Sequence, residues 1–414
     1  MNVEEESGTA SLPLFKALVS NIERLPKSFS WAALLAGFLV VFISTTGPIA
    51  ILYQAAAAGN LPINIINSWL FAVFLGSGLF GLLLSLRFGI PIVGSWASTT
   101  TALLVTGLVD HKFSDVIGAY FGASVLLIVV GLTGVFSRIM NLIPHPIIMA
   151  MLAGVLLVFE LRMFTSSREN PILGIFMILI YFVGRILNWR APVLAAFFLG
   201  LVTVVLQRKV DFPALDFSVV QPVWTNPTFS IASFFTLAIP IFLMVMTTQN
   251  APGIALLRAV NYQAPVNQIV HFGGTLSLLG AGFGGAGVNL SAMTATLAIS
   301  PETDPNPKTR YFAGVTSGVV YSIAALFAGI FSTLFGTFPV ELTAILAGLA
   351  LLPVISNALS DSLEKRDFKD AAVVTFFVTA SGISAFGVGA PFWGLLAGLL
   401  INQLNVIRVR LHRR

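Results

Sequence analysis

Long apolar stretches separated by short polar interruptions recur along the whole chain. A helix needs about 17–25 mostly apolar residues to cross the hydrocarbon core of a bilayer. The pattern predicts fourteen helical spans, of which the third and tenth are short, interrupted by glycine and preceded by extended stretches, as half-helices would be. The spans cover residues 31–53, 66–86, 92–108, 115–135, 145–161, 171–187, 191–207, 231–256, 266–282, 287–300, 311–335, 339–357, 370–386 and 390–406.

The composition agrees with this pattern and excludes a soluble protein. Of the 414 residues, 57% are hydrophobic and only 9% are charged, whereas the surface of a soluble protein needs many more charges. The first thirty residues lack the cationic and apolar stretches of a signal peptide. Cysteine is absent, which excludes disulfides and thiolate metal sites, and we expect no cofactor and no metal. The prediction is an all-α polytopic membrane protein.

The positions of the basic residues orient the spans, because Lys and Arg collect in cytoplasmic loops. When the N-terminus is placed inside, 17 of the 22 Lys and Arg residues fall on the cytoplasmic side. We therefore expect a bacterial-type cytoplasmic (inner) membrane with both termini in the cytoplasm. The net charge of +5 follows from this distribution, and no nucleic-acid partner is needed to explain it.

The two halves of the chain resemble each other. AMLAGVLLV (150–158) matches AILAGLALL (344–352), and SWASTTTALL (95–104) matches NLSAMTATLA (289–298), in both cases 194 residues apart. Three further matches keep the same order at offsets up to 204 residues. Apolar stretches also match by chance, but the shared order favours a true repeat. Since each repeat holds seven spans, an odd number, the second repeat is inverted, as in many secondary transporters.

Each half carries one break in its apolar pattern, GIPIVGSWASTTT (89–101) and GGAGVNLSAM (284–293). Non-helical backbone at membrane depth is tolerated only where protein or a water-filled cavity surrounds it. The first turn of a helix leaves N–H groups unpaired and stabilises an anion. Inverted symmetry points the two half-helix starts, near Ser95 and Asn289, at each other. Both residues also suit simple N-caps, but paired breaks favour a substrate site, and the glycines let the backbone approach a ligand.

A second polar cluster, MTTQNAPG (246–253), lies within the eighth predicted span, and its repeat partner is ISTTGP (43–48). Polar side chains of this kind often hold membrane helices together. Gln249 and Asn250 exceed what such contacts need, so we expect them to contact a ligand.

Titratable groups are scarce in the predicted spans. Glu160, Glu341 and Asp361 fall near span ends, where we expect them at the interface. An anionic substrate suits a site of amides, hydroxyls and helix N-termini, because a nearby acid would repel it. His271 is the one titratable group predicted inside a span. A lone histidine there is more often a packing residue than a proton relay, so both roles stay open.

Three segments resemble a known family: AIPIFLMVMTTQNAPGIALLRAVNY (238–262), GAGFGGAGVNLSAMTATL (280–297) and PETDPNPKTRYFAGV (301–315). They are similar to the benzoate/proton symporter family, which is related to the nucleobase and sulfate carriers, and the resemblance runs from about residue 30 to 405. It implies a fold of seven plus seven inverted spans, in which a core domain slides against a gate domain like an elevator.

The resemblance also implies domain boundaries, with spans 1–4 and 8–11 in the core and the others in the gate. They give a cytoplasmic N-terminal segment (1–30), a core domain in two parts (31–137 and 231–337), a gate domain in two parts (138–210 and 338–407), an amphipathic connecting segment (211–230) and a basic C-terminal tail (408–414).

Matching positions in spans 1, 3, 8 and 10 imply a substrate site. The nucleobase carriers have a Glu in the eighth span, where this chain has Gln249 and Asn250. That difference favours a carboxylate over a nucleobase and leaves proton coupling without an acid, so the proton would travel with the substrate or through His271. The implied substrate-binding residues are Thr46, Ser95, Gln249, Asn250, Gly287 and Asn289.

The predicted function is a secondary transporter in the lipid bilayer that imports benzoate, or a related anionic aromatic carboxylate, together with protons. A nucleobase or inorganic-anion carrier of the same fold is the alternative, and an anion channel is a more remote one. An enzyme is not expected, because metalloprotease, serine-hydrolase and Walker A motifs are absent from the sequence. Analogy with relatives of this fold suggests a homodimer.

Overall fold

The computed structural model describes residues 14–136, 138, 144–189, 191–210, 217–292, 294–301, 303–383, 385 and 388–412, most of which are helical. The elements of the first half are α1 (Leu14–Arg24), η2 (Leu25–Ser28), α2 (Trp31–Ala58), α3 (Ile63–Phe88), β1 (Gly94–Trp96), α4 (Ser98–Asp110), α5 (Phe113–Thr133), α7 (His145–Glu169), α8 (Pro171–Ile186) and α9 (Pro192–Leu206). Those of the second half are α10 (Ile231–Ser233), η3 (Phe234–Ala238), α11 (Ile239–Met244), η4 (Val245–Asn250), α12 (Ala251–Ala259), α13 (Val266–Ala281), β2 (Val288–Leu290), α14 (Ala295–Ile299), α15 (Tyr311–Leu326), α16 (Ala328–Gly336), α17 (Val340–Leu363), η5 (Arg366–Phe368), α18 (Lys369–Ala380) and α19 (Ala390–His412).

The helices form because a chain in a bilayer has to satisfy its backbone hydrogen bonds internally. Polar and cyclic residues mark their starts. The Ser30 hydroxyl accepts a hydrogen bond from the backbone N–H of Ala33 and caps α2. Pro171 and Pro192 open α8 and α9, at a position where a missing N–H costs nothing.

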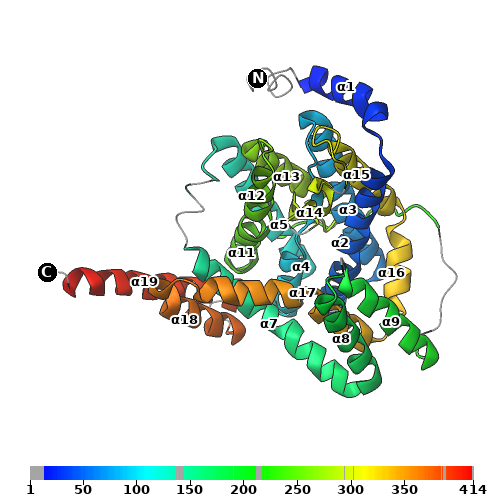
Figure 1. Cartoon of the computed structure of the whole chain (residues 1–414). Coiled ribbons are helices and arrows are strands. Elements are labelled where there is room, and N and C mark those ends of the chain that lie inside the picture. Colours follow the sequence, from blue (N-terminus) through cyan, green and yellow to red (C-terminus); the bar gives the residue numbers. More distant parts are fainter. Residues whose placement is uncertain are drawn as a thin grey trace.

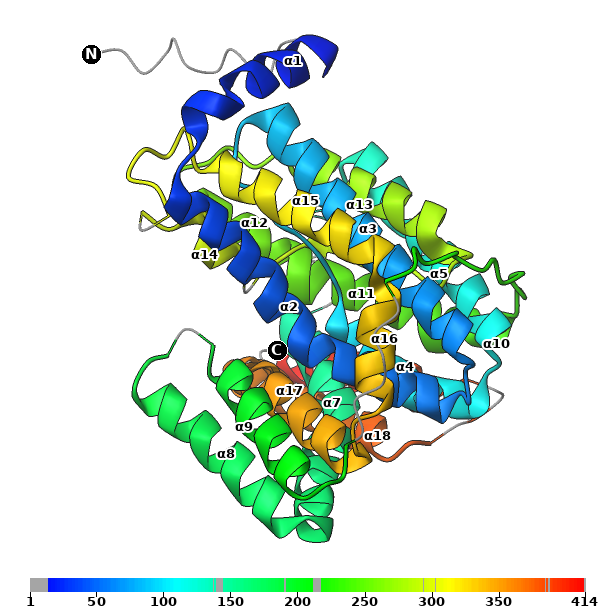
Figure 2. The same cartoon turned by 90° about the vertical axis from the view of Figure 1, so that its right-hand side faces the viewer.

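The long helices pack in two groups. The first helix group consists of α2, α3, α4, α5, α11, α12, α13, α15 and α16, in which α3 packs on α15 and α5 on α13. The second helix group consists of α7, α8, α9, α17, α18 and α19, in which α7 packs on α17 and α18, and α8 on α9. The second group lies below the first in two perpendicular views (Figures 1 and 2). The main contact between the groups is made by α17 on α2.

Two connections hold the ends of the first helix group. α1 lies across the end of α3 (Figure 2), where the Asn21 side chain donates a hydrogen bond to the carbonyl oxygen of Leu86 at 2.8 Å. Residues 217–230 run as an extended strap without helix. The backbone N–H of Val220 bonds the carbonyl of Leu326, and that of Thr228 bonds the carbonyl of Ser114. The strap therefore ties α5 and α15 together.

The structure confirms a polytopic helical membrane fold and changes several predicted elements. Among the described residues, six helices are long and apolar enough to cross a membrane, and one of them is the continuous run Ile231–Ala259 from α10 to α12. There are seven if α15 and α16, which meet at 66°, form one span; α8 and α9 are shorter. Fourteen crossings and the inverted repeat therefore stay predictions. α7 continues to Glu169, eight residues beyond the predicted end. The tenth predicted span (287–300) begins with β2, and the one helix described within it is the five-residue α14. Parts of the predicted segments lie outside the described residues: 1–13, 137, 139–143, 190, 211–216, 293, 302, 384, 386–387 and 413–414.

Candidate functional site

The two breaks in the apolar pattern meet inside the first helix group. β1 and β2 pair antiparallel, with Ser95 opposite Asn289 and Gly94 opposite Leu290. The backbone N–H of Ala97 extends the pairing by bonding the carbonyl of Gly287 at 3.1 Å. Two short polar segments from distant parts of the chain thus satisfy each other's backbone groups in a place where water is scarce.

We call the place where β1 and β2 pair the crossing, and two glycines are required for it. Gly287 has a φ of 72°, a left-handed backbone conformation that residues other than glycine rarely adopt. A Cβ at Gly94 would overlap the carbonyl oxygen of Ser77 on α3. The sequence therefore folds here as paired strands because glycine allows both the turn and the close approach to α3.

Asparagine side chains fix the crossing from behind. The Asn250 side-chain oxygen accepts a hydrogen bond from the backbone N–H of Leu290 at 3.0 Å. The Asn289 amide nitrogen donates to the carbonyl of Gly287 at 2.6 Å. Asn289 is fully buried, and its side-chain oxygen has no partner within the described part of the chain. Asn250 thus holds β2 against η4, and Asn289 fixes the turn before β2, so both support the site's geometry.

A cavity lies beside the crossing, between the first and second helix groups. Its volume is about 140 Å³, well below the roughly 300–1,000 Å³ of pockets for drug-sized ligands, so it suits a small molecule. Its polar wall comes from Ser44, Ser95, Ser98, Gln249, Ser291 and Thr294, and its apolar wall from Ile43, Gly47, Pro48, Ile51, Trp96, Val193, Ala350, Leu351 and Val354. We call this the crossing cavity.

The polar wall consists of hydroxyls and one amide. The hydroxyls of Ser44 and Thr294 lie 2.9 Å apart, and those of Thr294 and Ser291 lie 2.7 Å apart, so the three form one hydrogen-bonded chain. The Gln249 side-chain oxygen accepts from the backbone N–H of Ala292 at 3.4 Å, which leaves its NH₂ group available as a donor. Ser98 begins α4, whose first N–H groups carry partial positive charge.

This arrangement can hold an anion but offers no acid–base chemistry. The described lining residues include no carboxylate, histidine or basic group. Within the described residues, no group of three His, Cys, Asp or Glu side chains could hold a metal. Hydroxyl and amide donors at a helix N-terminus stabilise negative charge without a counter-ion.

Of the expected site residues, some line the crossing cavity and others lie behind it or apart from it. Ser95 and Gln249 line the crossing cavity, whereas Asn250, Gly287 and Asn289 form the crossing behind it. Thr46 is buried on α2, where its hydroxyl donates to the carbonyl of Phe42 at 2.8 Å.

His271 lies away from the crossing cavity. It is half-buried on α13, where its backbone packs directly on Gly131 of α5. Its Nδ1 atom has no hydrogen-bond partner within the described residues. The position fits a packing residue and brings no contact with the cavity lining.

Sequence reasoning missed one residue and misplaced another. Tyr321 of α15 is fully buried, and its hydroxyl lies near those of Ser44 and Ser95 without a hydrogen bond to either among the described residues. Nothing in an apolar span marked this tyrosine as a neighbour of Ser44 and Ser95. Glu160, expected at the interface, is instead only 8% exposed, because α7 extends past it by more than two turns.

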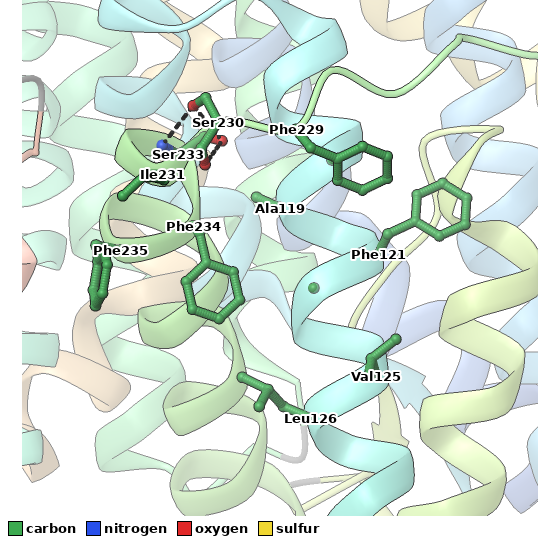
Figure 3. Close-up of a pocket in the computed structure, with 12 residues that line it drawn as sticks. Ala119, Phe121, Val125, Leu126, Phe229, Ser230, Ile231, Ser233, Phe234 and Phe235 are labelled. Carbon is green, nitrogen blue, oxygen red and sulfur yellow. Dashed lines mark hydrogen bonds between the residues drawn. The ribbon is translucent and has the colours of Figure 1, made fainter.

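A larger cavity elsewhere does not suit an anion. It measures about 730 Å³ and lies between α5 and the start of the eighth span, where Phe121, Phe229 and Phe234 line it (Figure 3). Its hydroxyls, on Ser230 and Ser233, already bond each other at 2.9 Å (Figure 3). The cavity is therefore an apolar groove without a free polar contact for a carboxylate.

Comparison with known proteins identifies the family. The sequence matches the benzoate membrane transport protein family over residues 27–404. The chain belongs to that family. It is 39% identical over 378 residues to the inner membrane protein YdcO of Escherichia coli (strain K12), covering 91% of this chain and 97% of the relative. It is 34% identical over 379 residues to the benzoate membrane transport protein of Acinetobacter baylyi (strain ATCC 33305 / BD413 / ADP1), covering 92% and 96%.

Solved structures show that this family member shares the fold of anion transporters. SLC26A9 is similar with a TM-score of 0.60 and 13% identity, over 95% of this chain and 69% of that one. The transmembrane domain of the cyanobacterial bicarbonate transporter BicA has a TM-score of 0.56 and 12% identity, over 90% and 96%. Murine Slc26a9, described as an anion transporter, has a TM-score of 0.59 and 15% identity, over 99% and 74%. The family, rather than these distant structures, makes the protein a membrane transporter.

Proposed function

We propose that the protein imports benzoate or a related aromatic carboxylate together with a proton. The observation that carries the proposal is the crossing cavity, a small site with hydroxyl and amide donors, no carboxylate and an extensive apolar wall. The name of the Acinetobacter relative, a benzoate membrane transport protein, supports the choice of substrate.

The two walls of the crossing cavity match the two parts of benzoate. The carboxylate group lies against Ser95, Gln249 and the start of α4, where N–H and O–H donors replace its hydration. The ring lies against Val193 and Val354, whose apolar surfaces are contributed by the second helix group. Substrate then contacts both groups, with its charge held by the first.

The domain arrangement extends this proposal. The first helix group corresponds to the core domain (31–137 and 231–337) and the second to the gate domain (138–210 and 338–407). In an elevator-like cycle the core carries the bound anion past the gate, and alternating access follows. We further propose a homodimer in a bacterial inner membrane with both termini in the cytoplasm, in line with the name of YdcO and the positive-inside pattern.

An inorganic-anion carrier is the second candidate. The volume of about 140 Å³ leaves little space around an aromatic ring, and BicA, a bicarbonate transporter, shares the fold. A nucleobase is less well matched, because the described lining residues include no carboxylate to accept its N–H groups. Competition between these substrate classes separates the candidates.

The test is uptake of labelled benzoate into proteoliposomes, with and without an inward proton gradient. Protein-free liposomes give the background, because undissociated benzoic acid crosses bilayers unaided. We expect gradient-stimulated uptake that unlabelled benzoate suppresses and that uracil and sulfate leave unchanged. Suppression by sulfate or bicarbonate would favour the inorganic-anion carrier, and absence of protein-dependent benzoate uptake would refute the proposal.

Gln249→Ala tests the assignment of the site. Removing one hydrogen bond to a charged group costs about 1.5–3 kcal/mol, so we expect benzoate affinity to fall roughly 10–100-fold. Gln268→Ala on the exposed face of α13 is the matched control and should bind as the unmodified protein does. Equal affinity in both variants would remove Gln249 from the site.

A further inference from the structure

Glu160 is a buried acid that has no part in the crossing cavity. Its side chain is 8% exposed, and neither carboxyl oxygen has a hydrogen-bond partner among the described residues. It is the one acidic residue that is buried in the described part of the chain. It belongs to α7, one of the helices long enough to cross the membrane. Ionisable groups in such helices are costly and mark ion or proton paths.

The surroundings of Glu160 favour its neutral form. An ionised carboxylate with no partner is strongly unfavourable in a low-dielectric interior. The neighbouring Met163 packs directly on Gly348, in the middle of α17. Glu160 therefore lies at the depth where α7 and α17 cover each other, and this packing holds a protonated carboxyl group.

Charged groups are remote from Glu160 on most helices that pack against α7. These helices are α17, α18, α8, α19, α4 and α11. α11 carries no charged residue. Those of α7 itself are exposed. On α4, α17, α18 and α19 the titratable residues stand at or near helix ends: Asp110, Glu341, Asp361, Lys369, Asp370, Arg408, Arg410 and His412.

α8 is the exception, because it brings the phenol of Tyr181 near Glu160. Tyr181 is fully buried and interacts electrostatically with Glu160 and with Arg185, one turn further along α8. The Tyr181 hydroxyl has no hydrogen-bond partner among the described residues. A buried phenol that interacts with both a buried acid and a guanidinium group can accept and donate a proton.

Tyr181 and Arg185 also border a second cavity, which we call the vestibule. It has a volume of about 410 Å³. Three residues line both the vestibule and the crossing cavity: Ile43, Val193 and Ala350. Tyr181 and the candidate substrate site thus border the same space.

We propose that Glu160 carries the proton that is transported with the substrate. In the packed arrangement the carboxyl group is protonated and neutral. For release, its O–H bond breaks, the proton passes by way of the Tyr181 hydroxyl to water in the vestibule, and a carboxylate remains. Uptake of a proton on the opposite side of the membrane restores the O–H bond and allows the acid to be buried again. The inference rests on the proposed proton-coupled function.

Glu160→Gln tests the inference, because glutamine keeps the shape of the protonated acid and cannot titrate. Two readouts are compared in proteoliposomes: the initial rate of benzoate uptake with and without a proton gradient, and benzoate exchange at equal pH on both sides. One pH unit drives at most about tenfold accumulation per proton. We expect Glu160→Gln to lose the stimulation by the gradient and to retain exchange.

Three control variants make the result decisive. Glu341→Gln removes an acid of the same helix group that pairs with Lys209 at 3.9 Å, and it should keep the stimulation. His271→Gln should keep it too. Glu160→Asp retains a carboxyl group and should restore the stimulation.

The outcomes separate the inference from the function on which it rests. Stimulation that persists in Glu160→Gln, or that disappears only in His271→Gln, would overturn the role of Glu160. Loss of exchange together with stimulation in folded Glu160→Gln would assign Glu160 a structural role instead. Benzoate uptake by the unmodified protein without any gradient effect would refute proton coupling itself.

Discussion

Gly47 lies at a tight contact between the first and second helix groups. It lies on α2, and a Cβ added there would stand less than 3.0 Å from the Cβ of Ala350 on α17, whereas ordinary contacts measure 3.4–4 Å. The Ala350 methyl group cannot rotate out of the way, because it is attached directly to the backbone. Gly47→Ala therefore requires the groups to move apart.

The cost of that movement sets the expected effect. Overpacking by one methyl group costs about 1–3 kcal/mol. If the groups slide in the elevator-like cycle, the contact exists in only one of the end states. The penalty then falls on that state alone and shifts the equilibrium by roughly 5–150-fold toward the other.

The absence of cysteine makes the shift measurable. A single cysteine placed by Val354→Cys in the crossing cavity reacts with a small, membrane-impermeant thiol reagent at a rate proportional to the population that exposes it. We expect Gly47→Ala to lower the rate of modification from the vestibule side. Ala350→Gly in the same chain removes the obstructing methyl group and should restore the rate.

Two outcomes would contradict sliding at Gly47. If folded Gly47→Ala reacts as fast as its parent, the contact of Gly47 with Ala350 persists in all states and the groups do not slide at this place. If the rate falls but Ala350→Gly fails to restore it, the change acts elsewhere. Thermal unfolding of each variant in detergent checks that all of them are folded.

Two further substitutions test the site and the fold. Tyr321→Phe removes only a hydroxyl. If that hydroxyl binds substrate, benzoate affinity measured by calorimetry falls about tenfold or more. The melting temperature stays equal or rises, because the lost hydroxyl was buried and unpaired. Arg310→Met removes three hydrogen bonds, to the carbonyls of Asp304, Ile299 and Pro305. It should destabilise the protein by about 3 kcal/mol or more in thermal unfolding, whereas Arg258→Met, on the exposed side of α12, should have little effect.

Hydropathy predicted the helices well, because the bilayer leaves the backbone few alternatives. α2, α3, α5 and α13 all lie within a few residues of their predicted bounds. Hydropathy could not predict where a helix bends. α15 and α16 meet at 66° around Phe327, a residue as apolar as its neighbours, so the bend depends on packing that the pattern does not record.

The site was predicted in outline but not in detail. The paired breaks marked the place where β1 meets β2, because glycine and polar residues at membrane depth need a special reason. The sequence predicts that Gln249 and Asn250 act alike, yet both belong to the π-helical η4, in which consecutive side chains point in different directions. Gln249 faces the crossing cavity and Asn250 faces β2. In a helix with apolar residues on every side, no periodicity reveals which direction leads to the cavity.

Glu160 shows how a small boundary error hides a functional candidate. Ending the fifth span at residue 161 placed this acid at the membrane surface, but α7 continues to Glu169. The hydropathy signal fades there because Arg162, Arg168 and Glu169 follow, and these side chains are exposed. The helix nevertheless keeps its inner face buried through Met163 and Ser166.

The separation of Glu160 from the crossing cavity has a physical rationale in the proposed mechanism. Two negative charges about 4 Å apart repel by about 4 kcal/mol at an effective dielectric constant of 20, which would cancel much of what the hydroxyls and Gln249 contribute. With the anion held by the first helix group and the acid buried in the second, each is stabilised by its own surroundings. A neutral Glu160 adds no repulsion to the bound anion, while a carboxylate opposes the packing of α7 on α17. Proton transport and substrate transport are thereby coupled through the packing of the two helix groups, although the proton and the substrate bind at different sites.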